Sequence, residues 1–193
     1  MTFVDRLLQD WRIRKARPFI RPGDRVLDLG SADGVLFDRL GTCGPGSVGI
    51  DPVLPATTRT RQGFSLVRGY FPQDIPPGAG PFDAIVMLAV LEHFPADQYR
   101  PLAEGCARLL RPGGRLIITV PSPAVDAILA VLVKVRLVHG MSLEEHHGYD
   151  IEETPVIFPA PQFRLLERTP FQLGLNNLFV FERQAPNGLP SAP

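Results

Sequence analysis

The sequence has few cysteines, no long apolar run and no net charge, and each of these absences argues against a class of protein. Its two cysteines, Cys43 and Cys106, are far apart and form no CxxC pair, so neither a disulfide framework nor a cysteine metal site is expected. No stretch reaches the roughly 18 consecutive apolar residues of a membrane span, and the N-terminus lacks the basic and then apolar layout of a signal peptide. We therefore expect a cytoplasmic protein without stable membrane insertion.

The charges cancel over the whole chain but not along it. Lys and Arg number 20, and so do Asp and Glu, which argues against a large phosphate-neutralising surface and hence against a nucleic-acid partner. Residues 1–25 nevertheless carry Lys15 and six arginines against three aspartates, and residues 141–153 carry five acids and no Lys or Arg. The chain is therefore basic at its start and acidic after residue 140.

The pattern of apolar residues predicts an α/β fold. At 193 residues the chain is long enough for one well-buried domain and short for two. Several apolar runs are continuous, as in parallel strands that are buried on both faces. Segments with helical character separate most of these runs, which indicates a sheet with crossover helices. The strand-like runs are 25–29, 47–50, 64–67, 82–88 and 115–120, and the helical segments are 3–17, 34–41, 95–110 and 124–138.

The end of the sequence follows a different order. Two strand-like runs, 164–169 and 178–183, are joined by a loop that contains Gly174, Asn176 and Asn177 and leaves no room for a helix. So short a connection can only join antiparallel strands, so the sheet should be mixed and finish with a hairpin.

The stretch "VLDLGSADG" (26–34) runs from a strand through small residues into a helix. Gly30, Ala32 and Gly34 allow a backbone to approach a ligand closely, and the start of the helix offers unpaired N–H groups. Asp51 follows 21 residues after Gly30, at the tip of the next strand, where a carboxylate can accept hydrogen bonds from two ribose hydroxyls. The alternative is an ordinary strand-to-helix turn with an aspartate in a neighbouring turn.

Four segments together resemble the class I S-adenosylmethionine-dependent methyltransferases: "VLDLGSADG", "VGIDP", "GPFDAIVMLAVLEHF" and "LLRPGGRLIITVPSP". The resemblance implies a single-domain Rossmann-like fold with a seven-stranded mixed sheet, in which the last hairpin supplies the one antiparallel strand. It also implies that S-adenosylmethionine, which becomes S-adenosylhomocysteine, lies across the carboxyl ends of the strands. The cofactor-binding residues implied in this way are Asp28, Gly30, Ser31 and Gly34 around the methionine part, Asp51 and Pro52 at the ribose, Tyr70 and Phe71 beside the adenine, and Leu88 and Ala89 after strand four.

The sequence departs from this family at three places. Ala32 stands where many relatives have a glycine. After strand three, relatives often place an acid or amide for the adenine amino group, but this chain offers none until Gln73 and Asp74. Between Asp51 and Phe64 the chain is too short and too rich in Pro and Thr for a full helix, so the second crossover helix should be reduced or lost.

Methyl transfer to a hydroxyl needs a base, whereas transfer to a carboxylate does not. The candidates are His146 and His147 in "EEHHGYD", with His93 in "LEHF" as the next choice. The alternatives are a solvated loop for the first pair, and helix capping or packing of the cofactor loop for His93. We expect no metal site, because adjacent histidines point in different directions and further ligands cannot be placed.

Two features of the sequence bear on the identity of the methyl acceptor. The segment 125–138 is apolar nearly all round, so it must be covered by the N-terminal helix, by a second subunit in a homodimer, or by an apolar or lipid-linked substrate. The ending "FQLGLNNLFVFER" is similar to endings of bacterial methyltransferases that act on sugars. These signals favour a small-molecule acceptor, with a hydroxyl of a saccharide or related metabolite as nucleophile.

Two further expectations complete the interpretation. We expect one methyltransferase domain over residues 1–185, with an N-terminal helix in 1–20 and a substrate-side insertion at 121–162, followed by a flexible tail at 186–193. The alternative function is a non-catalytic S-adenosylmethionine-binding protein that regulates a partner. It is supported by the compact substrate region and by the missing helix after strand two.

Overall fold

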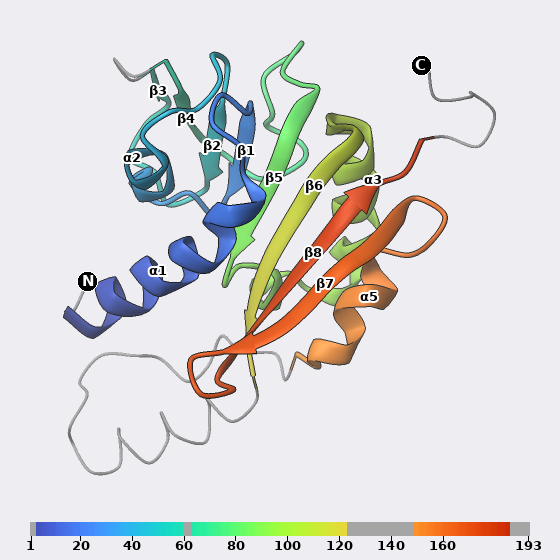
Figure 1. Cartoon of the computed structure of the whole chain (residues 1–193). Coiled ribbons are helices and arrows are strands. Elements are labelled where there is room, and N and C mark those ends of the chain that lie inside the picture. The colour runs from blue at the N-terminus through green and yellow to red at the C-terminus, as the bar shows by residue number, and fades with distance from the viewer. Residues whose placement is uncertain (1–2, 60–62, 123–148, 186–193) are drawn as a thin grey trace.

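The chain folds around one mixed β-sheet (Figure 1). The structure is a computed structural model and describes residues 3–59, 63–122 and 149–185. The strand order in the sheet is β3-β4-β2-β1-β5-β6-β8-β7. The strands are β1 (Val26–Leu29), β2 (Val48–Asp51), β3 (Thr58–Arg59), β4 (Ser65–Arg68), β5 (Phe82–Leu88), β6 (Leu110–Pro121), β7 (Phe163–Phe171) and β8 (Asn176–Arg183).

The seven predicted strands are all present, and the prediction of a mixed sheet is confirmed. Strands β4, β2, β1, β5 and β6 pair in parallel. Strand β8 is antiparallel to both β6 and β7, as expected for a terminal hairpin. The two-residue strand β3 is an addition that we did not predict, and it pairs antiparallel with β4 at the edge of the sheet.

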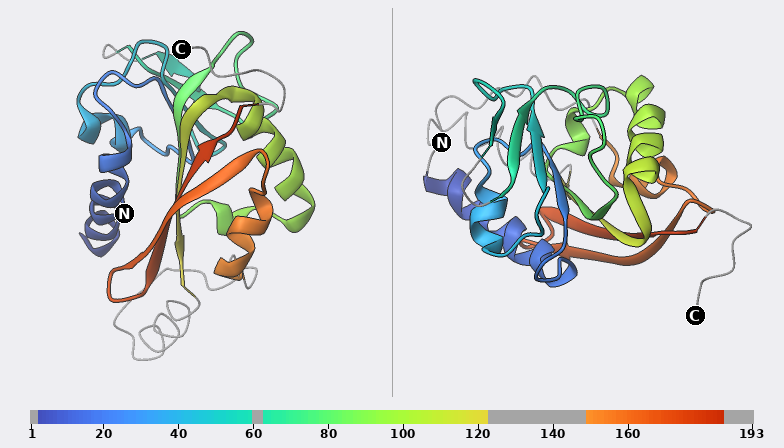
Figure 2. Two further views of the ribbon diagram at one scale, coloured as in Figure 1. Left: turned by 45° about the vertical axis from the view of Figure 1, so that its right-hand side comes forward. Right: turned by 90° about the horizontal axis from the view of Figure 1, so that it is seen from above.

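Helices cover both faces of the sheet, which explains why the strands are apolar on successive residues. Figure 2 shows α1 (Phe3–Ala16) and α2 (Val35–Leu40) on one side of the sheet, and α3 (Tyr99–Leu109) and α5 (Thr154–Ile157) on the other. Neighbouring strand residues alternate between two hydrophobic clusters, one under each pair of helices. Each fully buried Leu or Ile contributes about 1.5–3 kcal/mol.

The two clusters take their members from both the strands and the helices. Strand residues of the α3 and α5 side include Leu27, Leu29, Ile85, Met87, Leu116 and Ile118, and those of the α1 and α2 side include Val26, Ala84, Val86, Ile117 and Val180. Cys106 lies in the first cluster and is fully buried, as is Leu102 on the same helix, so it packs in the core. Burial raises the pKa of its thiol.

The predicted helices agree with the structure wherever it describes them. The segment 3–17 forms α1, which ends at Ala16. The short 3-10 helix η1 (Arg17–Phe19), which contains Pro18, follows directly. The segment 34–41 forms α2, and 95–110 forms η3 (Ala96–Gln98) and α3. The predicted helix at 124–138 lies outside the described residues. Two further 3-10 helices, η2 (Leu91–His93) and η5 (Ile151–Glu153), complete the described elements.

Two connections depart from simple crossovers. Residues 111–114 bulge out of β6. Leu110 pairs with Phe82, and Arg115 pairs with Ala84, so four residues of β6 stand opposite one residue of β5. Between β2 and β4, the described residues 52–59 and 63 contain no helix, which agrees with the expected loss of the second crossover helix. Within the described ranges no helix is long and apolar enough to cross a membrane.

Candidate cofactor site at the carboxyl edge of the sheet

The turn after β1 requires a glycine at its first position. Gly30 has φ 73°, and its N–H donates to the carbonyl of Ile50 at 2.9 Å, which draws the loop toward β2. A Cβ atom at Gly30 would lie 2.4 Å from Val90 Cγ2. The loops after β1 and β5 therefore approach each other so closely that no side chain fits between them.

Ala32 occupies the next left-handed position of this loop. Its φ is 44°, a conformation that glycine adopts readily and alanine adopts at a cost. Its N–H donates to Asp51 Oδ2 at 2.9 Å, and this bond helps to hold the conformation. The departure at Ala32 noted in the sequence thus falls on a strained residue.

Asp51 ends β2 and ties two loops together. Its side chain is buried, and Oδ1 accepts a hydrogen bond from the N–H of Val53 at 2.9 Å while Oδ2 accepts the bond from Ala32. An ionised carboxylate has about four acceptor sites. Asp51 is therefore fixed in position and still has acceptor sites left for a ligand.

Asp28 and Ser31 are buried polar residues beside the glycine turn. Burial and, to a smaller extent, the charge on Asp51 raise the pKa of Asp28 well above its usual range. Ser31 packs over Gly49, where a Cβ would lie 2.7 Å from Ser31 Oγ. This hydroxyl is buried and has no hydrogen-bond partner among the described residues. Gly34 (φ 84°) closes the turn with an N–H bond to the Ser31 carbonyl at 2.8 Å.

A pocket of about 260 Å³ opens at this edge of the sheet. Its walls come from the carboxyl ends of β1, β2 and β4 and from the segment that follows β5. In an open parallel sheet, this edge is where ligands bind. The residues that line the pocket are Leu29, Gly30, Ile50, Pro52, Gly69, Tyr70, Phe71, Val90, His93, Phe94, Pro95 and Gln98.

The structure brings most of the predicted cofactor-binding residues to this edge. Gly30, Pro52, Tyr70 and Phe71 line the pocket itself. The other residues of the set are not part of its wall: Asp28, Ser31, Gly34, Asp51, Leu88 and Ala89. Within this second group, Ala89 has φ 58° and donates its N–H to the Thr119 carbonyl at 2.8 Å, so the chain bends sharply where β5 ends.

The candidate bases are placed only in part. His93, at the end of η2, lines the pocket together with the predicted cofactor-binding residues. His146 and His147 lie outside the described residues. The last two residues of their segment have structural contacts, because Asp150 accepts a hydrogen bond from the N–H of Glu152 and Tyr149 shares one with Thr154 Oγ1 at 2.6 Å.

Sequence reasoning missed four pocket residues in the segment after β5. Val90 and Phe94 line the pocket and stand in the quoted segment "GPFDAIVMLAVLEHF", but we gave them no role, and Pro95 and Gln98 line it outside every quoted segment. Their only signal is their position between the fourth strand of the resemblance and its following helix.

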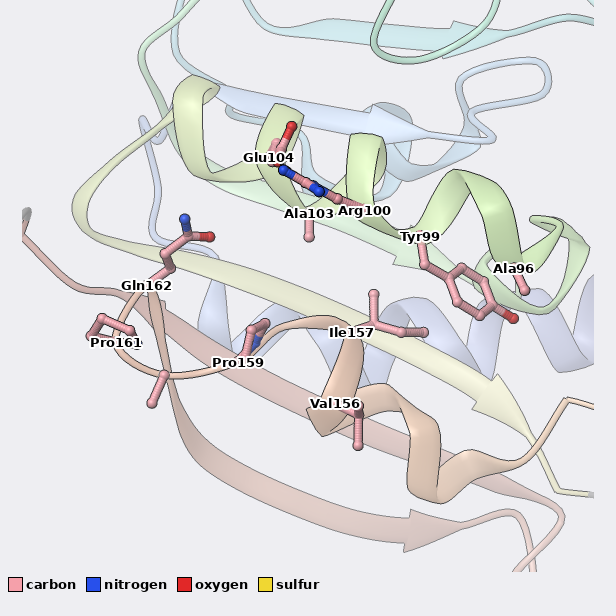
Figure 3. Close-up of a pocket in the computed structure, with 11 residues that line it drawn as sticks. Ala96, Tyr99, Arg100, Ala103, Glu104, Val156, Ile157, Pro159, Pro161 and Gln162 are labelled. Atoms are coloured by element: carbon pink, nitrogen blue, oxygen red, sulfur yellow. Dashed lines mark hydrogen bonds and ion pairs between the residues drawn. The ribbon is translucent and has the colours of Figure 1, made fainter.

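A second cavity, of about 500 Å³, lies between α3 and α5 (Figure 3). Tyr99 and Arg100 line it from α3, where Arg100 pairs with Glu104, and Val156 and Ile157 line it from α5. None of the predicted cofactor-binding residues lines this cavity. The smaller pocket at the carboxyl edge is therefore the candidate functional site.

Comparison with known proteins identifies the family. Residues 2–159 match the family described as "Methyltransferase domain", and the chain belongs to this family. The resemblance to class I S-adenosylmethionine-dependent methyltransferases is thereby confirmed, and with it the predicted cofactor, S-adenosylmethionine.

Similar sequences include proteins named ubiquinone biosynthesis O-methyltransferase. The one from Xylella fastidiosa (strain M23) is 30% identical over 135 residues, which cover 66% of this chain and 54% of that protein. The one from Xanthomonas campestris pv. campestris (strain B100) is 36% identical over 121 residues, covering 57% of this chain and 49% of that protein. The chain thus spans about half the length of the curated relatives it matches.

Solved structures with the same fold are more distant in sequence. The N-methyltransferase NodS from Bradyrhizobium japonicum WM9 has a TM-score of 0.59 at 18% identity, covering 94% of this chain and 97% of that chain. The 1,6-didemethyltoxoflavin-N1-methyltransferase from Burkholderia thailandensis has a TM-score of 0.66 at 16% identity, covering 95% of this chain and 81% of that chain. It was solved with 1,6-didemethyltoxoflavin and S-adenosylhomocysteine bound. At these identities the likeness shows a shared fold.

Proposed function

We propose that this protein transfers the methyl group of S-adenosylmethionine to a hydroxyl of a small molecule, such as a saccharide or related metabolite. The observation that carries the proposal is the carboxyl edge of the sheet, where Gly30, the fixed carboxylate of Asp51 and the pocket come together. The names of the curated relatives support oxygen as the acceptor atom, because those proteins are O-methyltransferases. The saccharide is favoured by the sequence ending alone.

The residues at this edge fit the parts of the cofactor. Asp51 has acceptor sites left for two ribose hydroxyls. The mostly apolar pocket beside Tyr70 and Phe71 suits a flat nucleobase. Ser31 Oγ, buried and without a partner among the described residues, suits a polar group of the methionine part next to Asp28 and the Gly30 turn.

When bound, S-adenosylmethionine supplies a methyl group on a positively charged sulfur. The protein then has to hold the acceptor oxygen in line with that methyl group and exclude water. Gly30 and Val90 lie so close together that no side chain fits between them on this wall of the pocket. Because burial raises the pKa of Asp28, this residue would attract the positive charge of the cofactor only when its carboxyl group is ionised.

A histidine completes the proposed mechanism by taking the proton of the acceptor hydroxyl. We keep His146 and His147 as the proposed bases, because an imidazole titrates near neutral pH. We expect that His146→Ala or His147→Ala lowers turnover on the order of 100-fold while cofactor affinity stays within about threefold. Near-normal turnover in both single variants and in the double variant would show that this pair has no catalytic role.

His93 provides a contrast to the proposed bases, because it lines the pocket with the cofactor-binding residues. We expect His93→Ala to weaken cofactor binding by about 3- to 10-fold through lost contacts in the pocket. Equilibrium titration with S-adenosylhomocysteine measures this directly. An unchanged affinity together with a loss of turnover would make His93 the base.

The direct test of function is transfer of a labelled methyl group from S-adenosylmethionine to a panel of saccharides, phenols and carboxylic acids. We expect labelled product from at least one hydroxyl acceptor and a dependence on Asp51. Tight cofactor binding without turnover on any acceptor, together with a stable complex with another enzyme, would favour the regulatory alternative. The absence of a helix from the described residues between β2 and β4 is the observation that supports that alternative.

A further inference from the structure

The pocket at the carboxyl edge has few polar side chains. Among its 12 lining residues, Tyr70, His93 and Gln98 have side chains with hydrogen-bonding groups, and the others are glycines, prolines and apolar residues. A flat, neutral heteroaromatic group can bind against such apolar walls. The few polar side chains then determine which nucleobase is accepted.

The loop after β4 does not supply an acid or amide side chain for the adenine amino group. Asp74 turns back on its own loop, because its Oδ2 accepts a hydrogen bond from the N–H of Tyr70 at 2.8 Å, and a Cβ on Gly69 would lie 2.4 Å from Asp74 Cβ. Gln73 is exposed and is not part of the pocket wall. The first amide and the first acid after β4 thus both lie outside the pocket wall.

Gln98 reaches the pocket from a different element. It ends η3 and is the N-cap residue of α3, but its side chain makes no capping hydrogen bond to the described first turn of that helix. Gln98 is exposed, as Gln73 is, but unlike Gln73 it is part of the pocket wall.

Helix α3 packs against the loop after β4, which contains Tyr70 and Phe71. A Cβ on Gly105 of α3 would lie 2.9 Å from the ring of Phe71 and 2.9 Å from Pro72 Cβ, so the loop after β4 rests directly on the helix. Gln98, the residue before α3, shares the wall of this small pocket with Tyr70 and Phe71, which are the residues proposed to flank the adenine.

We propose that Gln98 recognises the adenine of the cofactor through the 6-amino group and an adjacent ring nitrogen. A side-chain amide offers one acceptor oxygen and two donor hydrogens. This arrangement complements the amino group and ring nitrogen of adenine, as it does when Gln reads adenine in DNA. The inference rests on the proposed function, since it assigns a part of the cofactor to the pocket.

The test pairs a change in the protein with a change in the ligand. S-adenosylhomocysteine, and its analogue with hydrogen in place of the 6-amino group, are titrated calorimetrically into the full-length wild type, Gln98→Ala and Gln73→Ala. We expect the wild type to bind the analogue about 3- to 10-fold more weakly than S-adenosylhomocysteine, in line with one net hydrogen bond. Gln98→Ala should bind the two ligands with affinities within about twofold of each other. Both affinities should be close to the weaker one, that of the wild type for the analogue. The exposed control Gln73→Ala should discriminate like the wild type.

Gln98→Glu gives a second readout, because the carboxylate keeps an acceptor for the amino group and loses the donors. It should still prefer the amino-bearing ligand. The inference is overturned if Gln98→Ala binds S-adenosylhomocysteine as tightly as the wild type, or if it discriminates between the ligands equally well. If one of these two results is found and the wild type still binds S-adenosylhomocysteine, only the role of Gln98 is overturned and the proposed function is not affected. A wild type that binds neither ligand overturns both.

Discussion

Ala32 has a left-handed backbone conformation, φ 44°, at the middle of the loop after β1. Such a φ costs alanine about 1–2 kcal/mol relative to glycine, and the greater freedom of unfolded glycine offsets part of this. We therefore expect Ala32→Gly to raise the free energy of unfolding by about 0.5–1 kcal/mol, or the melting temperature by about 1–4 °C. Thermal denaturation measures both this variant and the control Ala107→Gly, which makes the same change inside α3. The control should lower the melting temperature. A fall in stability for Ala32→Gly would contradict the strain.

Asp28 gives the protein a pH dependence whose sign follows from burial. Because burial, and secondarily the charge on Asp51, raise the pKa of Asp28 in the folded protein, the folded state binds more protons than the unfolded state above about pH 4. Its contribution to stability therefore falls as the pH rises from about 4 toward the raised pKa. We expect Asp28→Asn to flatten this fall, measured by urea unfolding at several pH values.

The control for Asp28 is Asp38→Asn, which changes an exposed carboxylate in α2. This control should keep the wild-type dependence of unfolding free energy on pH. If Asp28→Asn and the wild type lose stability in parallel over this range, Asp28 is ionised in the folded protein as it is in the unfolded chain.

Among the elements, α3 has the most direct effect on the site, through Gly105. Replacing glycine by alanine inside a helix ordinarily stabilises it by about 1 kcal/mol, but a Cβ at Gly105 would lie 2.9 Å from Phe71 and Pro72. We expect Gly105→Ala to destabilise the protein by about 1–3 kcal/mol through overpacking, and to weaken cofactor binding by displacing Phe71. Chemical denaturation and ligand titration measure the two effects. Glu104→Ala, at the neighbouring exposed position, should leave both near the wild-type values, and a stabilised Gly105→Ala would contradict this packing.

The elements also show which features the sequence could predict. Continuous apolar runs identify β1, β2 and β5, because strands buried on both faces need apolar side chains on successive residues. The short connection at Gly174 predicts the terminal hairpin for steric reasons. Strand β3 has only two residues, and forms because β4 offers a free edge, which no local pattern indicates.

The site was predictable where a backbone requirement leaves a residue signature, as at Gly30 and Asp51. Gln98 leaves no such signature, because it lines the pocket from the position before α3 and lies outside every quoted segment. From the chain order, Gln73 and Asp74 are the first amide and acid after strand three. In the fold, Asp74 accepts a hydrogen bond from the N–H of Tyr70 in its own loop, and neither Asp74 nor Gln73 lines the pocket.

At the scale of the whole molecule, the parallel strands bring loops from distant parts of the sequence to one edge. The loops after β1 and β2 are joined through Asp51, the loop after β4 rests on α3, and the segment after β5 closes the pocket. A ligand that contacts all four must bind the folded state alone, so it should stabilise the protein as well as occupy the site.

The measurement that tests this account most directly is calorimetric titration of S-adenosylhomocysteine into the wild type and into Asp51→Ala and Asp51→Asn. We predict one site per chain in the wild type and affinity at least about tenfold weaker in both variants, since hydrogen bonds to a charged group contribute about 1.5–3 kcal/mol each. Circular dichroism of the variants confirms that they are folded. No binding to the wild type at millimolar ligand, or folded variants that bind as tightly as the wild type, would contradict a cofactor held at Asp51.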